Sequence, residues 1–196
     1  MRYDIAAVIL AAGKSERLGT PKQLVEWQGK TLINRAIDLA LDCALSPVIV
    51  VLGAYYPEIK KQIETKEQIK IINNHNWQNG QSTSLIAGVN AIRQLKQPVL
   101  ILLCDQPCLT TAIVDGVIQE YERSSKVAAM VDTQGKKTPP VILSPKLFDT
   151  IQRLEGDMGA REILKYQDVA YYQNSDEKAI LDIDTMEDYK KLLKCV

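Results

Sequence analysis

The sequence has little of what marks several large classes of protein. It contains a single histidine, His75, only 6% aromatic residues, and no run of about 18 apolar residues long enough to cross a bilayer. Lysine plus arginine and aspartate plus glutamate number 24 each. With no net charge, a broad nucleic-acid-binding or membrane-binding surface is not expected, so a phosphate-bearing ligand would need a local site.

Cysteine is also sparse. The four cysteines form no CxxC pair and the chain is too large to need a disulfide scaffold, so we expect free thiols at Cys43, Cys104, Cys108 and Cys195. Cys104 and Cys108 bracket three residues, but with one histidine and no second ligand pair in the chain a structural zinc site is not expected. The N-terminal sequence MRYD leads straight into an apolar segment without a signal region, which predicts a cytoplasmic protein.

What remains is ordinary globular material. The 196 residues are 46% hydrophobic and 24% charged, and no linker, repeat or low-complexity segment divides them. A chain of this size is typical of one compact domain, so we predict a single domain over residues 1–196.

Apolar runs alternate with amphipathic stretches along most of the chain. Ile5–Leu10, Val48–Leu52 and Val99–Leu103 are apolar at every position, which is typical of strands buried on both faces of a parallel sheet. Further strands are predicted at 69–72 and 127–131, and a peripheral or antiparallel part at 140–143 and 169–172. Helices are predicted at 32–45, 59–63, 84–95, 113–121 and 159–166, and from about Met186. The predicted fold class is α/β: a Rossmann-like, mostly parallel sheet with helices on both faces and a small antiparallel part.

The segment after the first strand has the composition of a phosphate-binding loop. It reads LAAGKSERLGTPKQL from Leu10 to Leu24, with small residues at 11–13 and two cations, Arg17 and Lys22. A Walker loop is excluded because position 8 is valine, and the GxGxxG dinucleotide spacing is missing. An ordinary turn with solvated cations is the alternative.

Two further segments follow predicted strands or begin predicted helices. The sequence NWQNGQSTSL begins at Asn76 and precedes a helix for which Ser82 or Thr83 is the expected N-cap. A helix N-terminus there favours polar or anionic ligands, although capping alone is the alternative. Asp105 follows a buried strand within CDQP, where a carboxylate is placed either to bind Mg²⁺ or simply to start a turn.

A pair of carboxylates precedes the last predicted helix. In DIDTMED, Asp182 and Asp184 are two residues apart, so on an extended stretch they share one face. Thr185 is the expected cap of the helix that follows. His75 is expected in a turn at the surface.

Together these segments resemble a known family. LAAGKSERLGTPK is similar to the signature L-A-(A/G)-G-x-S-x-R-(M/L)-G-x-x-K of the nucleotidyltransferases that include molybdenum cofactor cytidylyltransferase and guanylyltransferase, which have a glycosyltransferase-A-type fold. The stretch through Gly88, then DQP and DIDTMED, resemble N-x-x-W-x-x-G-x-x-x-S-L-x-x-G, D-x-P and D-(I/V)-D-T-P-E-D in the same order. The resemblance runs from about Ile5 to Tyr189.

The resemblance implies a role for each matching residue. Arg17 and Lys22 would hold phosphates, with Lys22 closest to the reacting α-phosphate, and Asp105 would bind the metal together with Asp184 or Asp182. The implied metal is Mg²⁺, or Mn²⁺ in its place. The residues implied to meet the base and ribose are Leu10, Ala11, Ala12, Gly13, Gly80 and Ser84.

The resemblance also implies a reaction: transfer of CMP from CTP to the phosphate of molybdopterin, with release of pyrophosphate. Ala12 favours CTP, since relatives that use GTP have glycine there. Guanylyl transfer, or transfer to a sugar or isoprenoid phosphate, is the alternative within the class. A nucleotide- or cofactor-binding carrier without catalysis is the alternative of another class. A molybdenum-dependent dehydrogenase is the implied transient partner; nucleic acid and membranes are not expected as partners.

The segments on the acceptor side depart from the family pattern. GKKTPPV, predicted as a loop that faces the acceptor, has Thr138 where the family commonly has glycine. GDMGAR has Met158 where lysine is frequent, and Asp157 is expected to cap the following helix. Gln81 replaces a frequent methionine. These departures leave the identity of the acceptor open.

Overall fold

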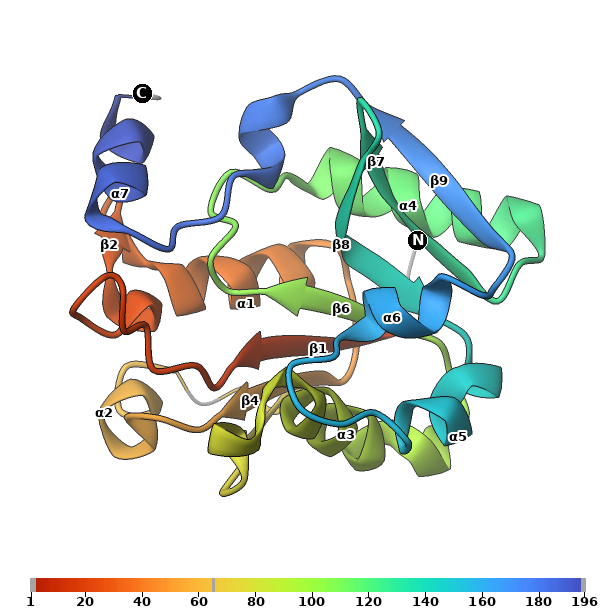
Figure 1. Ribbon diagram of the computed structural model, residues 1–196, viewed down its shortest axis with the longest axis horizontal. Coiled ribbons are helices and arrows are strands. Elements are labelled where there is room, and N and C mark those ends of the chain that lie inside the picture. Colours follow the sequence, from red (N-terminus) through yellow and green to blue (C-terminus); the bar gives the residue numbers. More distant parts are fainter. Residues whose placement is uncertain (1–2, 65, 195–196) are drawn as a thin grey trace.

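One twisted sheet organises the molecule, for which the computed structural model describes residues 3–64 and 66–194. Its order is β5-β4-β1-β6-β8-β7-β9 (Figure 1). The bounds are β1 Ala6–Ala11, β4 Val48–Leu52, β5 Ile69–Asn73, β6 Val99–Leu103, β7 Ala128–Thr133, β8 Lys136–Leu143 and β9 Val169–Asn174. A separate two-stranded sheet joins β2 (Glu26–Trp27) to β3 (Lys30–Thr31).

The predicted fold class is confirmed. Strands β5, β4, β1 and β6 are parallel neighbours, and β8 alone runs antiparallel, to both β6 and β7. Residues 135–141, expected to form a loop, are mostly strand, because β8 already begins at Lys136. A tight turn with positive φ at Gln134 and Gly135 pairs Lys136–Thr138 with Val131–Thr133, so these residues form a hairpin arm.

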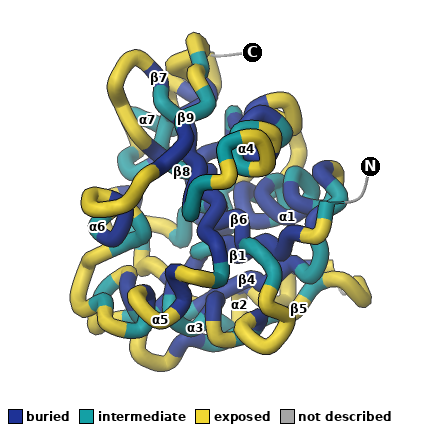
Figure 2. The backbone as a smooth tube through the Cα atoms, turned by 90° about the vertical axis from the view of Figure 1, so that its right-hand side faces the viewer, coloured by how far each residue is buried: buried dark blue, intermediate teal, exposed yellow. Residues whose placement is uncertain are grey.

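Helices cover both faces of the sheet because successive side chains of each strand point alternately into two hydrophobic cores. On β1, Ala7, Ile9 and Ala11 face one cluster while Ala6 and Val8 face the other. The first face is covered by α1 (Leu32–Asp42), α2 (Tyr56–Lys60) and α4 (Thr111–Ser124), the second by α3 (Gln81–Ile92), α5 (Phe148–Ile151) and α6 (Ala160–Leu164). Figure 2 shows β1, β4 and β6 as a buried layer between them.

Two of the predicted helix caps are wrong and one is confirmed. Helix α3 begins after Gly80, and the side chain of Thr83 accepts no capping bond but donates back to the Gly80 carbonyl at 2.8 Å. Helix α6 begins after Gly159 with no side-chain cap, so Asp157 does not cap it. Helix α7 (Met186–Leu193) has the predicted Thr185 cap, closed into a capping box by Asp188.

Two of the cysteines, Cys43 and Cys104, are buried. Cys43 and Cys104 are free thiols, as predicted, Cys108 forms no disulfide with a described residue, and Cys195 lies outside the described residues. Burial raises the pKa of Cys43 and of Cys104 to about 12. Over residues 3–64 and 66–194, the structure contains no helix with both the length and the apolar character needed to span a membrane.

Candidate active site

A cavity of about 500 Å³ lies at the carboxyl ends of β1 and β6. This is the edge at which open α/β sheets bind their ligands. The structure brings nine of the predicted site residues together in its wall, although they come from three separate segments of the chain. They are Leu10, Ala11, Ala12, Gly13, Arg17, Lys22, Gly80, Ser84 and Asp105.

A glutamine that the sequence patterns did not single out holds the glycine-rich loop in place. The side chain of Gln23 is fully buried and donates to the carbonyls of Ala11 (2.8 Å) and Gly13 (2.9 Å). In addition, the Ser15 hydroxyl accepts from the Lys22 backbone at 3.0 Å. These bonds close the loop on itself, so the peptide groups at its start and Lys22 at its end keep a fixed relation. Only its position next to Lys22 could have indicated from the sequence that Gln23 belongs to the site.

Four charged side chains meet at the rim of this cavity. Lys22 Nζ donates to Asp105 Oδ2 and to Asp184 Oδ1, the latter at 3.0 Å, and Arg17 donates to the other oxygen of Asp184 at 2.8 Å. Burial disfavours the Lys22 ammonium, but the two carboxylates outweigh that cost and raise the pKa of Lys22, which therefore stays charged. The predicted phosphate-binding cations thus lie directly on the predicted metal-binding carboxylates.

The chain reaches this arrangement through a backbone contact near its C-terminal end. The N–H of Ile183 donates to the carbonyl of Asp105 at 2.9 Å, and the Ile183 side chain is fully buried. The capping box of α7 fixes the next residues, and its hydrogen bonds lower the pKa of Asp188. Asp184 is therefore held against Asp105 although 79 residues separate them in the sequence.

Asp182 and Asp184 make different contacts. Asp182 accepts from Gln106 Nε2 at 2.9 Å, and the same amide group donates to Thr138 Oγ1 at 3.2 Å. Burial, followed by the charge of Asp105, raises the pKa of Asp182. Gln106 and Thr138 are both buried, so Thr138, which departs from the family pattern, joins a polar network behind Asp105.

The two carboxylates fit a divalent cation whose remaining coordination positions are filled by oxygens of a bound phosphate ligand and by water. Asp105 Oδ1 is buried and has no hydrogen-bond partner, and Asp184 shares the Lys22 ammonium with Asp105. In the part of the chain that the structure describes, no group of three or more histidine, cysteine, aspartate or glutamate residues is placed to hold a metal. Mg²⁺ typically takes one or two carboxylates together with phosphate oxygens and water, which matches this pair.

The far side of the cavity is shaped by backbone contacts and a buried asparagine. Gly80 has a φ of +103°, and a Cβ there would lie 2.1 Å from the carbonyl carbon of Gly156. Asn74 Nδ2 donates to Ser84 Oγ at 2.9 Å and to Thr83 Oγ1 at 2.8 Å. The Ser84 hydroxyl keeps its own proton to donate. Gly88, also in the motif, lets α3 approach β1, since a Cβ there would lie 2.4 Å from Val8 Cγ1.

A second cavity of about 340 Å³ adjoins the first, and Leu10, Gln81, Leu103 and Asp157 line both. Its apolar floor includes Leu85, Ile101, Met130 and Val141, and its polar wall includes Lys136, Lys137, Thr138, Arg161, Glu162 and Asp182. The Lys137 ammonium stacks on the Tyr171 ring at 4.3 Å from the centroid. Met158 is exposed at 39%, and His75 lies in an exposed turn as predicted.

A mostly parallel sheet with a glycine-rich loop, two cations and two carboxylates at its strand ends is typical of α/β proteins that bind their ligand in a crevice at this edge. Comparison with known families then identifies it further. Residues 7–174 match the MobA-like NTP transferase domain. The chain therefore belongs to the MobA-like NTP transferase family.

Individual relatives within this similarity carry different names. The chain is 30% identical to "Nicotine blue oxidoreductase" of Paenarthrobacter nicotinovorans, covering 96% of each sequence. It is 26% identical, again over 96% of each, to "Probable molybdenum cofactor guanylyltransferase" of Bacillus cereus strain Q1. Among solved structures, the Mycobacterium sp. strain JC1 homologue of Mycobacterium tuberculosis rv0371c superposes with a TM-score of 0.86 at 27% identity, covering 100% of this chain and 98% of that one.

Proposed function

We propose that the protein is a cytidylyltransferase that transfers CMP from CTP to a phosphate of molybdopterin and releases pyrophosphate. The observation that carries the proposal is the cluster in which Lys22 bridges Asp105 and Asp184 beside the cavity of about 500 Å³. A carrier that only binds a nucleotide has no need for two carboxylates at the phosphate end. Such a reaction draws on cytoplasmic nucleotides, so a cytoplasmic location is part of the proposal.

The residues of the chain perform positioning and charge stabilisation. The backbone of Leu10–Gly13 meets the base and ribose, and Arg17 and Lys22 take the phosphates. Charge that develops on the α-phosphate oxygens is then met by fixed cations, which is commonly the largest catalytic effect in such sites. Asp105 and Asp184 would hold Mg²⁺ or Mn²⁺, which would supply further charge neutralisation and orient the phosphates.

The acceptor is assigned to the cavity of about 340 Å³. Its apolar floor suits a flat organic body, while Lys136, Lys137 and Arg161 in its wall suit an anionic group. It adjoins the nucleotide cavity through shared residues, so an acceptor phosphate bound there would lie next to the bound nucleotide.

The preference for CTP rests on Ala12. This residue is 5% exposed, and its Cβ packs so close to Gly53 that a Cβ added to Gly53 would lie 2.9 Å from it. Compared with glycine, this methyl group takes up space beside the backbone that is proposed to meet the base, which supports a pyrimidine nucleotide. Guanylyl transfer is the second candidate, supported by the relative that carries that name.

The decisive assay measures pyrophosphate release from CTP, GTP, ATP or UTP with Mg²⁺ and molybdenum cofactor as acceptor. We expect turnover with CTP, and loss of at least about 100-fold in Asp105→Asn, since one preorganised electrostatic contact is commonly worth that much. The matched control is Asp149→Asn, at an exposed aspartate that pairs with Arg93. Unchanged turnover in Asp105→Asn would refute the metal assignment.

The same assay separates the alternatives. Turnover with GTP and not CTP would move the protein to guanylyl transfer, and turnover only with a sugar or isoprenoid phosphate would reassign the acceptor. Saturable CTP binding without turnover would support a carrier. Because one relative is named an oxidoreductase, reduction of nicotine blue is assayed in parallel. A molybdenum-dependent dehydrogenase, the proposed transient partner, is tested by co-purification with the product-loaded protein.

A further inference from the structure

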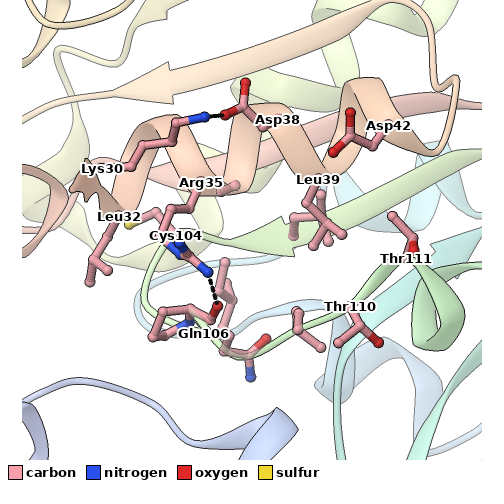
Figure 3. Close-up of a pocket in the computed structure, with 15 residues that line it drawn as sticks. Lys30, Leu32, Arg35, Asp38, Leu39, Asp42, Cys104, Gln106, Thr110 and Thr111 are labelled. Carbon is pink, nitrogen blue, oxygen red and sulfur yellow. Dashed lines mark hydrogen bonds and ion pairs between the residues drawn. The ribbon is translucent and has the colours of Figure 1, made fainter. Parts of the chain in front are cut away.

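A third cavity, of about 490 Å³, lies apart from the nucleotide and acceptor cavities. It is enclosed by α1, the end of β6, and the segment that leads into α4 (Figure 3). It meets the nucleotide cavity only at Leu103 and Cys104. None of the residues assigned above to phosphate, metal or base lines it, so the proposed function leaves it unexplained.

Arg35 is the unusual group in this cavity. It projects from α1 toward the segment after β6 (Figure 3), and its guanidinium lies 4.2 Å from the centroid of the buried Trp27 ring. Among the residues that the structure describes, it makes one hydrogen bond, which is long, from Nη2 to the Pro107 carbonyl at 3.4 Å. Its Nε is buried with no partner, and so is the indole Nε1 of Trp27.

The guanidinium therefore has one buried donor, Nε, without an acceptor. It has five N–H donors, and an unpaired buried donor is costly. Burial lowers the pKa of Arg35, which reflects the same deficit. Within residues 3–64 and 66–194, no carboxylate forms an ion pair with it, since nearby Asp38 is engaged by Lys30. The cation is fixed in place by stacking, and Asp38 acts on it only as a neighbouring charge, without a direct ion pair.

The other residues of the cavity wall limit which kind of ligand could bring a negative charge to Arg35. Leu32, Ala36, Leu39, Leu102 and Leu109 give the cavity an apolar side, which suits an organic body rather than a bare inorganic ion. Asp42, exposed at the end of α1, lies two helical turns from Arg35, about 10 Å along the axis. With one unpaired cation and acidic groups at the rim, a single negative charge is better accommodated than a phosphate dianion.

We propose that this cavity is a binding site for a small organic carboxylate, with the carboxylate on Arg35 and the apolar body against the leucine wall. A carboxylate matches a guanidinium edge through two parallel hydrogen bonds, which is the strongest neutralisation available to Arg35. The site lies behind the segment that carries Asp105, since Gln106 and Pro107 line this cavity while Asp105 lines the other.

The experiment uses hexanoate as the probe and hexylammonium as its cationic counterpart of the same chain length. Both are titrated into the full-length protein at constant ionic strength without nucleotide, and binding is followed by the NMR signals of the Arg35 Nε–H and the Trp27 indole N–H. We expect hexanoate to shift both signals saturably and hexylammonium to leave them unchanged. If neither signal moves with hexanoate, or both probes act alike, the proposal is wrong.

A pair of variants tests the contact itself. Arg35→Gln should weaken hexanoate binding by about tenfold or more, the fold-change expected on losing a charged hydrogen bond. The matched control Arg123→Gln, at an exposed arginine on α4 that pairs with Glu120, should bind hexanoate like the wild type. Equal binding to Arg35→Gln and wild type would overturn the assignment. The wild-type titration stands even if Arg35→Gln does not fold, and failure here leaves nucleotidyl transfer unaffected.

Discussion

Replacing Lys22 by glutamine removes the central cation of the charge cluster, and the resulting loss of stability should measure the repulsion between Asp105 and Asp184. Two carboxylate oxygens that accept from the same Nζ lie within about 6 Å of each other. At an effective dielectric constant of about 20, unit charges at that separation repel by about 3 kcal/mol. Since the Asp184 side chain is 35% exposed, solvent screening reduces the effect to about 2 kcal/mol. For a chain of this size, that corresponds to a fall in Tm of about 4–8 °C.

A divalent cation should reverse this loss. In the wild-type protein the Lys22 and Arg17 cations already pair with the two carboxylates, so Mg²⁺ or Mn²⁺ alone should raise the Tm only slightly. In Lys22→Gln, Asp105 loses its ammonium partner and Asp184 keeps only Arg17, so the carboxylates are more open to the metal. A ligand that binds only the folded state stabilises it as its concentration rises. Thermal unfolding with and without Mn²⁺ measures the difference. Binding of CTP with Mg²⁺ should weaken in the same variant because a phosphate contact is lost.

The control is Lys165→Gln, which removes an exposed lysine paired with Glu162 three residues away. Such a pair contributes about 0–1 kcal/mol, so its Tm should stay near that of the wild type with or without metal. The reasoning would be refuted if Lys22→Gln were as stable as the wild type. It would equally fail if Mn²⁺ raised the Tm of both proteins by the same amount.

Three further predictions concern single residues. Folding raises the pKa of Asp182, so ionisation of this carboxyl opposes folding above that pKa and has no effect below the unfolded value of about 4. Asp182→Asn should therefore raise the Tm at pH 7, and the gain should disappear by about pH 4. A gain in Tm that does not depend on pH would contradict the burial argument. Gly80→Ala combines a positive φ with a backbone clash and should lower the free energy of unfolding by about 3 kcal/mol in urea denaturation, whereas a near-neutral result would show that the neighbouring loop moves freely. Cys43 and Cys104 should resist iodoacetamide at pH 8 in the native protein, because burial raises both pKa values to about 12, and should react on unfolding. Mass spectrometry follows the labelling, and rapid labelling of the native protein would show that these thiols are not protected.

The strands were predictable because their signal is local. Val48–Leu52 and Val99–Leu103 are apolar throughout, and the structure gives both strands these same bounds. A strand buried on both faces by flanking helices requires apolar residues at every position, so composition alone defines it.

The helix caps near the site were harder to predict because tertiary contacts decide them. Ser82 and Thr83 have good capping side chains, but the Ser82 backbone donates to Gly156 at 3.1 Å and Thr83 donates to backbone carbonyls. The polypeptide therefore enters α3 through Gly80, whose positive φ is compatible with the close approach of the 156 loop. A contact between residues so far apart in the sequence cannot be predicted from local sequence patterns.

The membership of the site was largely predictable, whereas its internal contacts were not. Asp105 and Lys22 were both expected at the strand ends, but nothing in their sequence context indicates that they share Asp184. Ion pairs over 83 and 162 positions depend on how the sheet and the C-terminal segment pack. The roles of these residues in nucleotide and metal binding stay predictions until the assays above are done.

The hydrogen bond from Ile183 to Asp105 affects where the working unit of this protein ends. The match to the family domain stops at residue 174, which is also the last residue of β9. A fragment cut there would keep all seven strands of the sheet and yet lose Asp182, Asp184 and the bond that fixes the Asp105 segment. Anyone choosing boundaries for expression, or grafting this domain onto another chain, should therefore carry the polypeptide through α7.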